Sequence, residues 1–183
     1  MKKILIIIDM QNDFITGDLS VENGLDVVHR ITDKIDSSYD SIILTQDTHF
    51  DFGDDYYNTI EGSNLPSHCV YLSDGWKIVD DIVKEINDWR IPYVTVSKET
   101  FGSISVLPEA IERNIISDYT DLVIEICGVC TDICVVSNAL ILRSIFPQSR
   151  IIVDAGCCAG TSDEAHNAAL TVMRNCLIDV ING

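Results

Sequence analysis

Six short apolar runs, rich in β-branched residues, alternate with segments of helical periodicity along this chain of 183 residues. Continuous apolar runs are typical of strands that are covered on both faces of a sheet. Strands that alternate with helices favour a mostly parallel sheet with right-handed crossovers. The sequence therefore predicts an α/β fold, a three-layer α/β/α sandwich around a mostly parallel sheet of about six strands. The predicted strands are residues 3–9, 41–45, 92–97, 121–127, 150–154 and 177–181.

The segments between the runs predict amphipathic helices. Apolar residues recur at three- and four-residue steps over residues 76–86, and residues 134–142 and 165–173 follow the same pattern. Thr161 and Glu164 form a capping box that predicts the start of the last helix. No repeat or linker interrupts the pattern, so a single domain over residues 1–183 is expected.

Residues 48–75 depart from the alternation. They are rich in Asp, Gly, Asn and Tyr and have little periodicity, which predicts a long loop. A loop of this length inside a compact domain is usually functional.

The charge balance excludes several kinds of partner. There are 29 acidic and 12 basic side chains, a formal net charge of −17, whereas nucleic acids and anionic membranes bind clustered Lys and Arg. The apolar run at residues 4–8 is shorter than the roughly 7 to 15 residues of a signal-peptide core, and no stretch reaches the roughly 20 of a membrane span. Seven irregularly spaced cysteines then indicate reduced thiols, and we expect a cytoplasmic protein with no nucleic-acid or membrane partner.

Residues that can act as acids, bases, nucleophiles or metal ligands follow four of the predicted strands. Asp9 ends the first strand, Asp47 and His49 follow the second, Lys98 follows the third, and a cysteine-rich segment at residues 127–134 follows the fourth. Ligands in open α/β sheets bind beyond the carboxyl ends of the strands. We therefore expect an acid, a metal-ligand pair, a base and thiols to meet at one edge of the sheet.

Cys134 is the candidate nucleophile among the thiols. It lies three residues beyond Thr131, which we expect to be the N-cap of a helix. The positive end of the helix dipole would lower the pKa of the thiol, and the free N–H groups would hold an oxyanion. Cysteine is often a small core residue, and we expect no special role for four of the others. These four are Cys69, Cys157, Cys158 and Cys176.

Cys127 and Cys130 form a C-x-x-C pair at a strand-to-helix junction, a context that is typical of redox dithiols. A thiol–disulfide oxidoreductase is therefore the alternative from a different class. It leaves Asp9, Lys98 and the Asp-x-His motif without a role, so we rank it below the nucleophile interpretation.

Asp47 and His49 place two metal-ligand types on the same side of an extended backbone. His68, with Glu61, would close the site from the long loop. Two His and one carboxylate suit a catalytic Zn²⁺ with an open position, and they also suit Fe²⁺ in an oxygenase. His29 and His166 lie in polar helical contexts and are expected to be surface residues.

Three segments together resemble the signature of the isochorismatase-like cysteine hydrolases. They are Asp9-Met10-Gln11-Asn12-Asp13-Phe14, Lys98, and Gly128-Val129-Cys130-Thr131-Asp132-Ile133-Cys134-Val135. The segments Asp47-x-His49 and Leu65-Pro66-Ser67-His68-Cys69 are similar to the metal-binding segments of the nicotinamidase branch. The resemblance covers essentially the whole chain and implies a Rossmann-like, isochorismatase-like fold.

The resemblance also implies an amidase that converts nicotinamide and water to nicotinate and ammonia in NAD salvage. In this scheme Cys134 is the nucleophile, Asp9 takes its proton and Lys98 stabilises the charges. Backbone N–H groups of Cys130 and Cys134 would hold the oxyanion, and the peptide bond before Cys130 would be cis. The first alternative is a related cysteine hydrolase that acts on another small amide.

By the same resemblance, a divalent metal would orient the pyridine nitrogen of a small-molecule amide. The implied ligands are Asp47, His49 and His68 with Glu61 close by, and the implied metal is Zn²⁺, with Fe²⁺ or Mn²⁺ as alternatives. Phe14, Phe101 and Leu65 would contact the substrate ring. Some members carry a histidine at the position of Asp55 and an aromatic residue at the position of Leu65, so this chain departs from the pattern at both positions. The sequence leaves a homo-oligomer open.

Overall fold

A computed structural model describes residues 2–50, 55–114 and 122–183. Its centre is a six-stranded sheet in the order β3-β2-β1-β4-β5-β6, in which every neighbouring pair is parallel. The predicted α/β fold with a parallel sheet is confirmed. The strands are β1 (Lys2–Ile8), β2 (Ser41–Asp47), β3 (Tyr93–Lys98), β4 (Leu122–Val129), β5 (Arg150–Ala159) and β6 (Asp179–Ile181).

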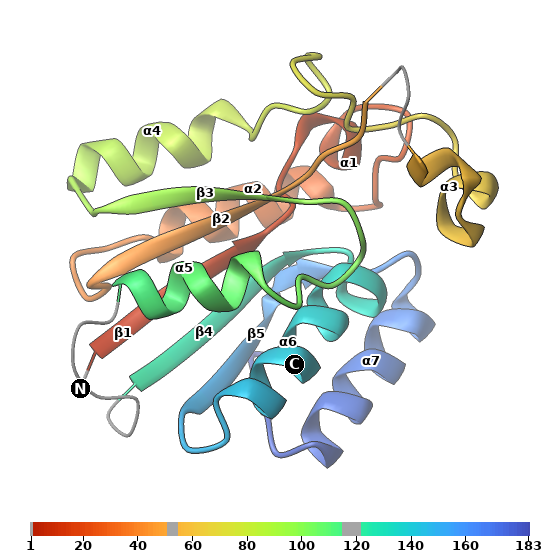
Figure 1. Ribbon diagram of the computed structural model, residues 1–183. Coiled ribbons are helices and arrows are strands. Elements are labelled where there is room, and N and C mark those ends of the chain that lie inside the picture. The colour runs from red at the N-terminus through yellow and green to blue at the C-terminus, as the bar shows by residue number, and fades with distance from the viewer. Residues whose placement is uncertain (1, 51–54, 115–121) are drawn as a thin grey trace.

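Helices cover both faces of the sheet and complete the three layers. Figure 1 shows α5, α6 and α7 in front of the sheet, with α2 and α4 behind it. The helices are α1 (Asn12–Ile15), α2 (Gly24–Lys34), α3 (Ile60–Asn64), α4 (Asp80–Trp89), α5 (Val106–Asn114), α6 (Val136–Ile145) and α7 (Asp163–Asn175). A 3₁₀ turn, η1 (Asp55–Asn58), precedes α3, and a π-helical turn, η3 (Thr131–Val135), precedes α6. In the part of the chain that the structure describes, no helix is long and apolar enough to cross a membrane.

The central strands form the core because both of their faces are covered. Ile4, Leu5, Ile6, Ile7 and Ile8 of β1 are all buried, and every residue of β4 is buried as well. This explains why these strands have continuous apolar sequences instead of an alternating pattern. The amphipathic pattern of α2 and α4 buries one stripe of each helix against the sheet.

Several predicted boundaries were wrong, for physical reasons. β2 continues to Asp47 because Gln46 and Asp47 still pair with Ser97 and Lys98 of β3. β6 begins only at Asp179 because Leu177 adopts a positive φ of 60° that ends the preceding turn. The first residue of the predicted fourth strand, 121, lies outside the described residues.

Two helix starts and the long loop also differ from the sequence prediction. Ser162, not Thr161, caps α7, because the Ser162 hydroxyl accepts a hydrogen bond from the N–H of Ala165 while Thr161 bonds Asp132. The helix predicted from residue 76 begins at Asp80. Residues 48–75 contain η1 and α3 instead of one continuous loop, and residues 51–54 of this segment lie outside the described residues.

The strand order reverses between β1 and β4, which is where ligands bind in sheets of this type. The two strands run closely side by side, with Ile8 paired to Gly128. Gly128 has a φ of 118°, and a Cβ atom there would lie 2.1 Å from the carbonyl oxygen of Ile8. Only glycine therefore lets the ends of these strands approach one another at the switch point.

Candidate active site

The carboxyl ends of β1 and β3 and the turn after β4 bring an acid, a base and a thiol into contact. Lys98 Nζ lies 2.7 Å from Asp9 Oδ2 and 3.7 Å from Cys134 Sγ. The negative charge of Asp9 also acts on the Cys134 thiol and raises its pKa. All three side chains are almost completely excluded from solvent. The structure thus brings together the three residues that the sequence analysis assigned to a catalytic triad.

A sharp turn after β1 aims the Asp9 carboxyl into this cluster. Asp9 has a positive φ of 48°, a conformation that Asp tolerates better than most residues. Thr45 of β2 fixes both the backbone and the side chain of Asp9. Its hydroxyl accepts a hydrogen bond from the Asp9 N–H at 3.0 Å and donates one to Asp9 Oδ1 at 2.6 Å. The remaining carboxylate oxygen, Oδ2, is left for Lys98.

Burial and charge set the pKa values of the cluster. Burial raises the pKa of Asp9 above its ordinary value, and the Lys98 ammonium only partly opposes this effect. Burial alone would lower the pKa of Lys98, but the neighbouring Asp9, Cys134 and Asp47 outweigh it and hold that pKa well above its ordinary value. At neutral pH Lys98 is therefore a fixed positive charge, and Asp9 is a more basic carboxylate than usual.

Cys134 lies in the π-helical turn η3, not in the first turn of an α-helix capped by Thr131. Cys130 is the residue at the N-terminal boundary of this turn, and the bond between Val129 and Cys130 is cis, as the family resemblance implied. The expected low pKa of Cys134 was wrong: burial raises it well above its ordinary value, and Lys98 does not compensate. The resting residue is a thiol, so a base must remove its proton before it reacts.

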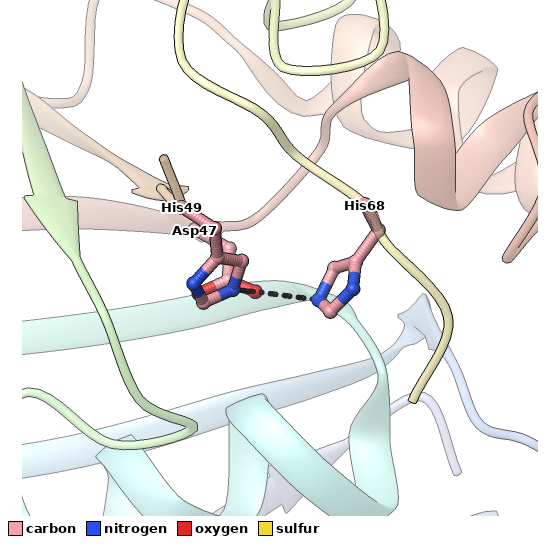
Figure 2. A group of neighbouring side chains, drawn as sticks. All are labelled: Asp47, His49 and His68. Carbon is pink, nitrogen blue, oxygen red and sulfur yellow. Dashed lines mark hydrogen bonds and ion pairs between the residues drawn. The ribbon is translucent and has the colours of Figure 1, made fainter. Parts of the chain in front are cut away.

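Asp47, His49 and His68 form a group that can hold a metal ion. Their potential ligand atoms all lie within 4.8 Å of one another, and all three side chains are buried. His49 Nε2 and His68 Nε2 each lie 3.2 Å from Asp47 Oδ2, and Figure 2 shows the two imidazoles converging on that carboxylate. Lys98 links this group to the triad, because its Nζ lies 3.2 Å from Asp47 Oδ1.

The surroundings of this group suit a divalent cation. His68 Nδ1 donates to the carbonyl of Pro66 at 2.8 Å, so a metal would bind at Nε2, the atom that lies 3.2 Å from Asp47 Oδ2. Although burial raises the pKa of Asp47, Lys98 and the two imidazoles outweigh it, so this carboxyl stays ionised. Within the described residues, His49 Nδ1 and the buried Oε1 of Glu61 have no hydrogen-bond partner. The donor set of Asp47, His49 and His68 therefore fits a metal. Glu61, the fourth ligand expected from the sequence, is not part of this group, although the charges of Asp47 and Lys98 act on its carboxyl.

Sequence reasoning missed the residues that hold these ligands in place. Gln11 is fully buried and clamps the backbone of Asp47, accepting from its N–H at 2.7 Å and donating to its carbonyl at 2.9 Å. The Tyr56 ring stacks on the His49 imidazole with centroids 3.6 Å apart. In the sequence, the only sign of this role is that Gln11 is a polar amide close behind Asp9, at the end of a buried strand. The side chain of Asp55 lies outside the described part of the structure.

A cavity of about 240 Å³ opens beside the triad and the metal-ligand group. This volume is slightly below the roughly 300–1,000 Å³ of clefts for drug-sized ligands, so the cavity suits a smaller molecule. Cys134, Asp47 and His68 line it together with the three residues predicted to contact a substrate. These are Phe14, Leu65 and Phe101, and Cys130 also lines the cavity.

The C-x-x-C pair does not have the surroundings of a redox dithiol. Cys127 is completely buried in β4, where burial raises the pKa of its thiol well above the ordinary value. Burial likewise raises the pKa of Cys130 to about 12. Thiol–disulfide exchange requires an accessible thiolate. The geometry therefore disfavours the oxidoreductase alternative.

The chain is similar to known proteins along its length. Residues 3–183 match the model of the Isochorismatase domain. The nicotinamidase of Schizosaccharomyces pombe is 31% identical over 210 residues, which cover 97% of this chain and 92% of that protein.

Solved structures have the same fold. A nicotinamidase/pyrazinamidase from Bacillus subtilis superposes with a TM-score of 0.83 at 21% identity, covering 98% of this chain and 99% of the other. The pyrazinamidase of Pyrococcus horikoshii, crystallised in complex with zinc, gives a TM-score of 0.76 at 22% identity and covers both chains completely. With its fold, the arrangement of its site and the family match in agreement, this chain belongs to the isochorismatase domain family.

Proposed function

We propose that this protein is a nicotinamidase-type amidohydrolase, which converts nicotinamide and water to nicotinate and ammonia. The observation that carries the proposal is the shared cavity: the thiol of Cys134 and the metal-ligand residues Asp47 and His68 line the same small space. A nucleophile and a ring-orienting site on one cavity suit a small aromatic amide. The similarity to the nicotinamidase of S. pombe supports the same substrate class.

The reaction begins with proton transfer from Cys134 to Asp9. The raised pKa of Asp9 makes it a stronger base, and the thiolate sulfur then forms a bond to the amide carbon. Backbone N–H groups of Cys130 and Cys134 hold the oxyanion of the tetrahedral intermediate. The C–N bond breaks as Asp9 returns the proton to the leaving nitrogen, which departs as ammonia.

Water completes the turnover by hydrolysing the thioester. Asp9 accepts a proton from the attacking water, the C–S bond breaks, and Asp9 returns that proton to the sulfur, which regenerates the thiol. The product leaves as nicotinic acid, which loses its remaining proton to the solvent and becomes nicotinate. Lys98 stays protonated throughout, and its charge stabilises both the Asp9 carboxylate and the thiolate. Because no step protonates or deprotonates Lys98, its role is electrostatic.

Asp47, His49 and His68 would hold a divalent ion, which we propose to be Zn²⁺, the metal named for the P. horikoshii structure. When bound, this ion supplies a coordination position for the ring nitrogen of the substrate. Glu61 would complete the shell directly or through water, since the charges of Asp47, Lys98 and His49 act on its carboxyl. Phe14 and Phe101 contact the faces of the ring, and Leu65 lines the cavity beside His68. We place the reaction in NAD salvage in the cytoplasm, which agrees with the seven free thiols.

The decisive experiment is an ammonia-release assay with nicotinamide, pyrazinamide, benzamide and propionamide, each with added Zn²⁺ or with chelator. Nicotinamide and pyrazinamide should be hydrolysed fastest. Benzamide has the same shape without the ring nitrogen and should show a higher KM. Hydrolysis of propionamide with no turnover of nicotinamide would replace the proposal by the alternative of a hydrolase for another small amide.

A further inference from the structure

Asn138 of α6 makes three hydrogen bonds that join Cys134 to residues 101–103, and both Cys134 and Phe101 line the cavity. Its Nδ2 donates to the carbonyl of Cys134 at 2.8 Å and to the carbonyl of Phe101 at 3.1 Å. Its Oδ1 accepts from the N–H of Ser103 at 2.9 Å. Asn138 is completely buried, and both of its amide hydrogens and its oxygen are used.

These bonds connect segments that are far apart in the sequence. Cys134 belongs to the turn after β4, whereas Phe101 and Ser103 belong to the segment between β3 and α5. Ser103 continues the connection, because its hydroxyl accepts from the N–H of Leu107 in the first turn of α5. Asn138 thus connects η3 with residues 101–103 and, through Ser103, with α5.

Gly102 provides a second, independent sign that this contact is built for close approach. A Cβ atom on Gly102 would lie 2.6 Å from Ile141 Cδ1 and 3.3 Å from Ser137 Cβ, both on α6. The backbone at Gly102 therefore packs directly on the helix surface on either side of Asn138. We call the contact between residues 101–103 and α6 the α6 joint.

The α6 joint ties the backbone of Phe101 to the backbone of Cys134. Both Phe101 and Cys134 line the small cavity, and the amide of Asn138 binds the backbone carbonyls of both. A displacement of residues 101–103 would widen the cavity without touching Asp9, Lys98 or the metal-ligand group. Binding of a flat aromatic ring depends on the width of the cavity between Phe101 and Cys134, whereas binding of a short aliphatic amide does not.

We propose that Asn138 is a positioning residue that makes the site selective for planar aromatic amides, by fixing the distance between the Phe101 wall and the Cys134 thiol. The inference rests on the proposed function for its substrate, but the joint itself can be tested without turnover. Asn138 touches no reacting atom, so its loss should change ring recognition more than chemistry.

The test compares Asn138→Ala, Asn138→Asp and Gly102→Val with wild type. Asn138→Asp keeps the acceptor for Ser103 but places a carboxylate oxygen against two carbonyls. Gly102→Val disturbs the joint from the loop side, because its branched side chain would meet Ser137 on α6 as well as the flexible end of Ile141. For each variant the KM of nicotinamide should rise about tenfold, a loss of about 1.4 kcal/mol in ring binding, while kcat changes less than threefold. Leu142→Ala, one turn further along α6, is the control for general destabilisation and should leave KM unchanged.

A second readout needs no turnover. The rate of alkylation of Cys134 is measured by peptide mass spectrometry with iodoacetamide and with its N-phenyl analogue. Wild type and Leu142→Ala should favour the N-phenyl reagent, and the joint variants should lose this preference while reacting normally with iodoacetamide.

Equal losses with both reagents, or an unchanged KM in Asn138→Ala and Gly102→Val, would show that the joint is only structural. If Asn138→Ala does not fold, Gly102→Val decides the matter. Absence of nicotinamide turnover in the wild type would refute the proposed function alone, since the ratio of alkylation rates still tests the joint.

Discussion

Lys98 Nζ and Asp9 Oδ2 form an ion pair of 2.7 Å in a site where neither side chain has appreciable contact with solvent. The same ammonium lies 3.2 Å from Asp47, so one positive charge neutralises an acid of the triad and a ligand of the metal group. Buried charges depend on their partners because water is not available to replace them. In the proposed function, catalysis and stability both depend on this lysine.

Replacing Lys98 by Met should abolish amide hydrolysis and destabilise the fold by about 3–5 kcal/mol, the range for removing one partner of a buried ion pair. Asp9 and Asp47 would then be buried without a counter-charge. Ammonia release and urea denaturation measure the two effects. Lys77→Met is the matched control, because Lys77 pairs with Asp74 on the surface and its loss should change neither quantity.

Cys134→Ala should leave the fold intact and reduce ammonia release by roughly 10⁶-fold, the order found when the nucleophile of a hydrolytic triad is removed. Two other thiols serve as controls. Cys176→Ala, at an exposed position, should be fully active, and Cys127→Ala should keep its activity as well. Full loss in Cys127→Ala with activity in Cys134→Ala would instead favour the redox alternative.

Zn²⁺ added to chelator-treated protein should raise the thermal midpoint, by the equivalent of about 2.7 kcal/mol when free metal is at 100 times its Kd. The increase follows because the three ligands are buried and close together only in the native state. His68→Ala should remove most of this shift. The exposed His29 offers the control: a His29→Ala variant that also loses the shift would place the metal elsewhere.

Stability at acid pH should depend on a second buried cluster, formed by Lys34, Glu125 and Asp154. Lys34 Nζ lies 2.5 Å from Asp154 Oδ2 and also contacts Glu125. Burial alone raises the pKa of both carboxyls, but hydrogen bonds from Lys34, together with Lys3 at Glu125 and Asn182 at Asp154, outweigh it and leave both pKa values below their ordinary range. Burial alone lowers the pKa of Lys34, yet the same hydrogen bonds raise it above its ordinary value.

The sign of the effect follows from these directions. Carboxyls with lowered pKa values stabilise the fold fully above about pH 5 and lose that contribution as the pH falls through their folded-state values. The raised pKa of Lys34 acts only at the alkaline end, above about pH 10. Asp154→Asn should therefore flatten the fall in unfolding free energy between neutral pH and pH 3. Asp33→Asn is the control, because Asp33 is exposed and lies next to Lys34 on α2; its unfolding free energy should fall with pH as steeply as that of the wild type.

The sequence allowed the sheet and the location of the site to be predicted, because both depend on local patterns. Continuous apolar runs identified the buried strands, and the polar residues after them, Asp9, Asp47 and Lys98, meet at the edge of the sheet as expected. In a parallel sheet, strand ends lie together whatever the lengths of the connections.

What escaped prediction depends on contacts between distant segments. Thr45 fixes Asp9, Gln11 clamps Asp47, and Asn138 bridges Cys134 to Phe101, and each is a polar residue whose partner lies in another part of the fold or on a neighbouring turn. The raised pKa of Cys134 was missed for a related reason. The helix-dipole argument considers one turn of chain, whereas burial is set by the whole structure.

The parallel order of the sheet also bears on how the enzyme becomes active during folding. Asp9 comes from the first strand and Cys134 from the turn after the fourth, and the pairing of β1 with β4 is the contact that brings them together. Contacts between such distant segments form late, because the loop between them must be closed first. No short fragment of this chain contains both Asp9 and Cys134, so in the proposed function the first detectable turnover in a refolding experiment would follow the pairing of β1 with β4.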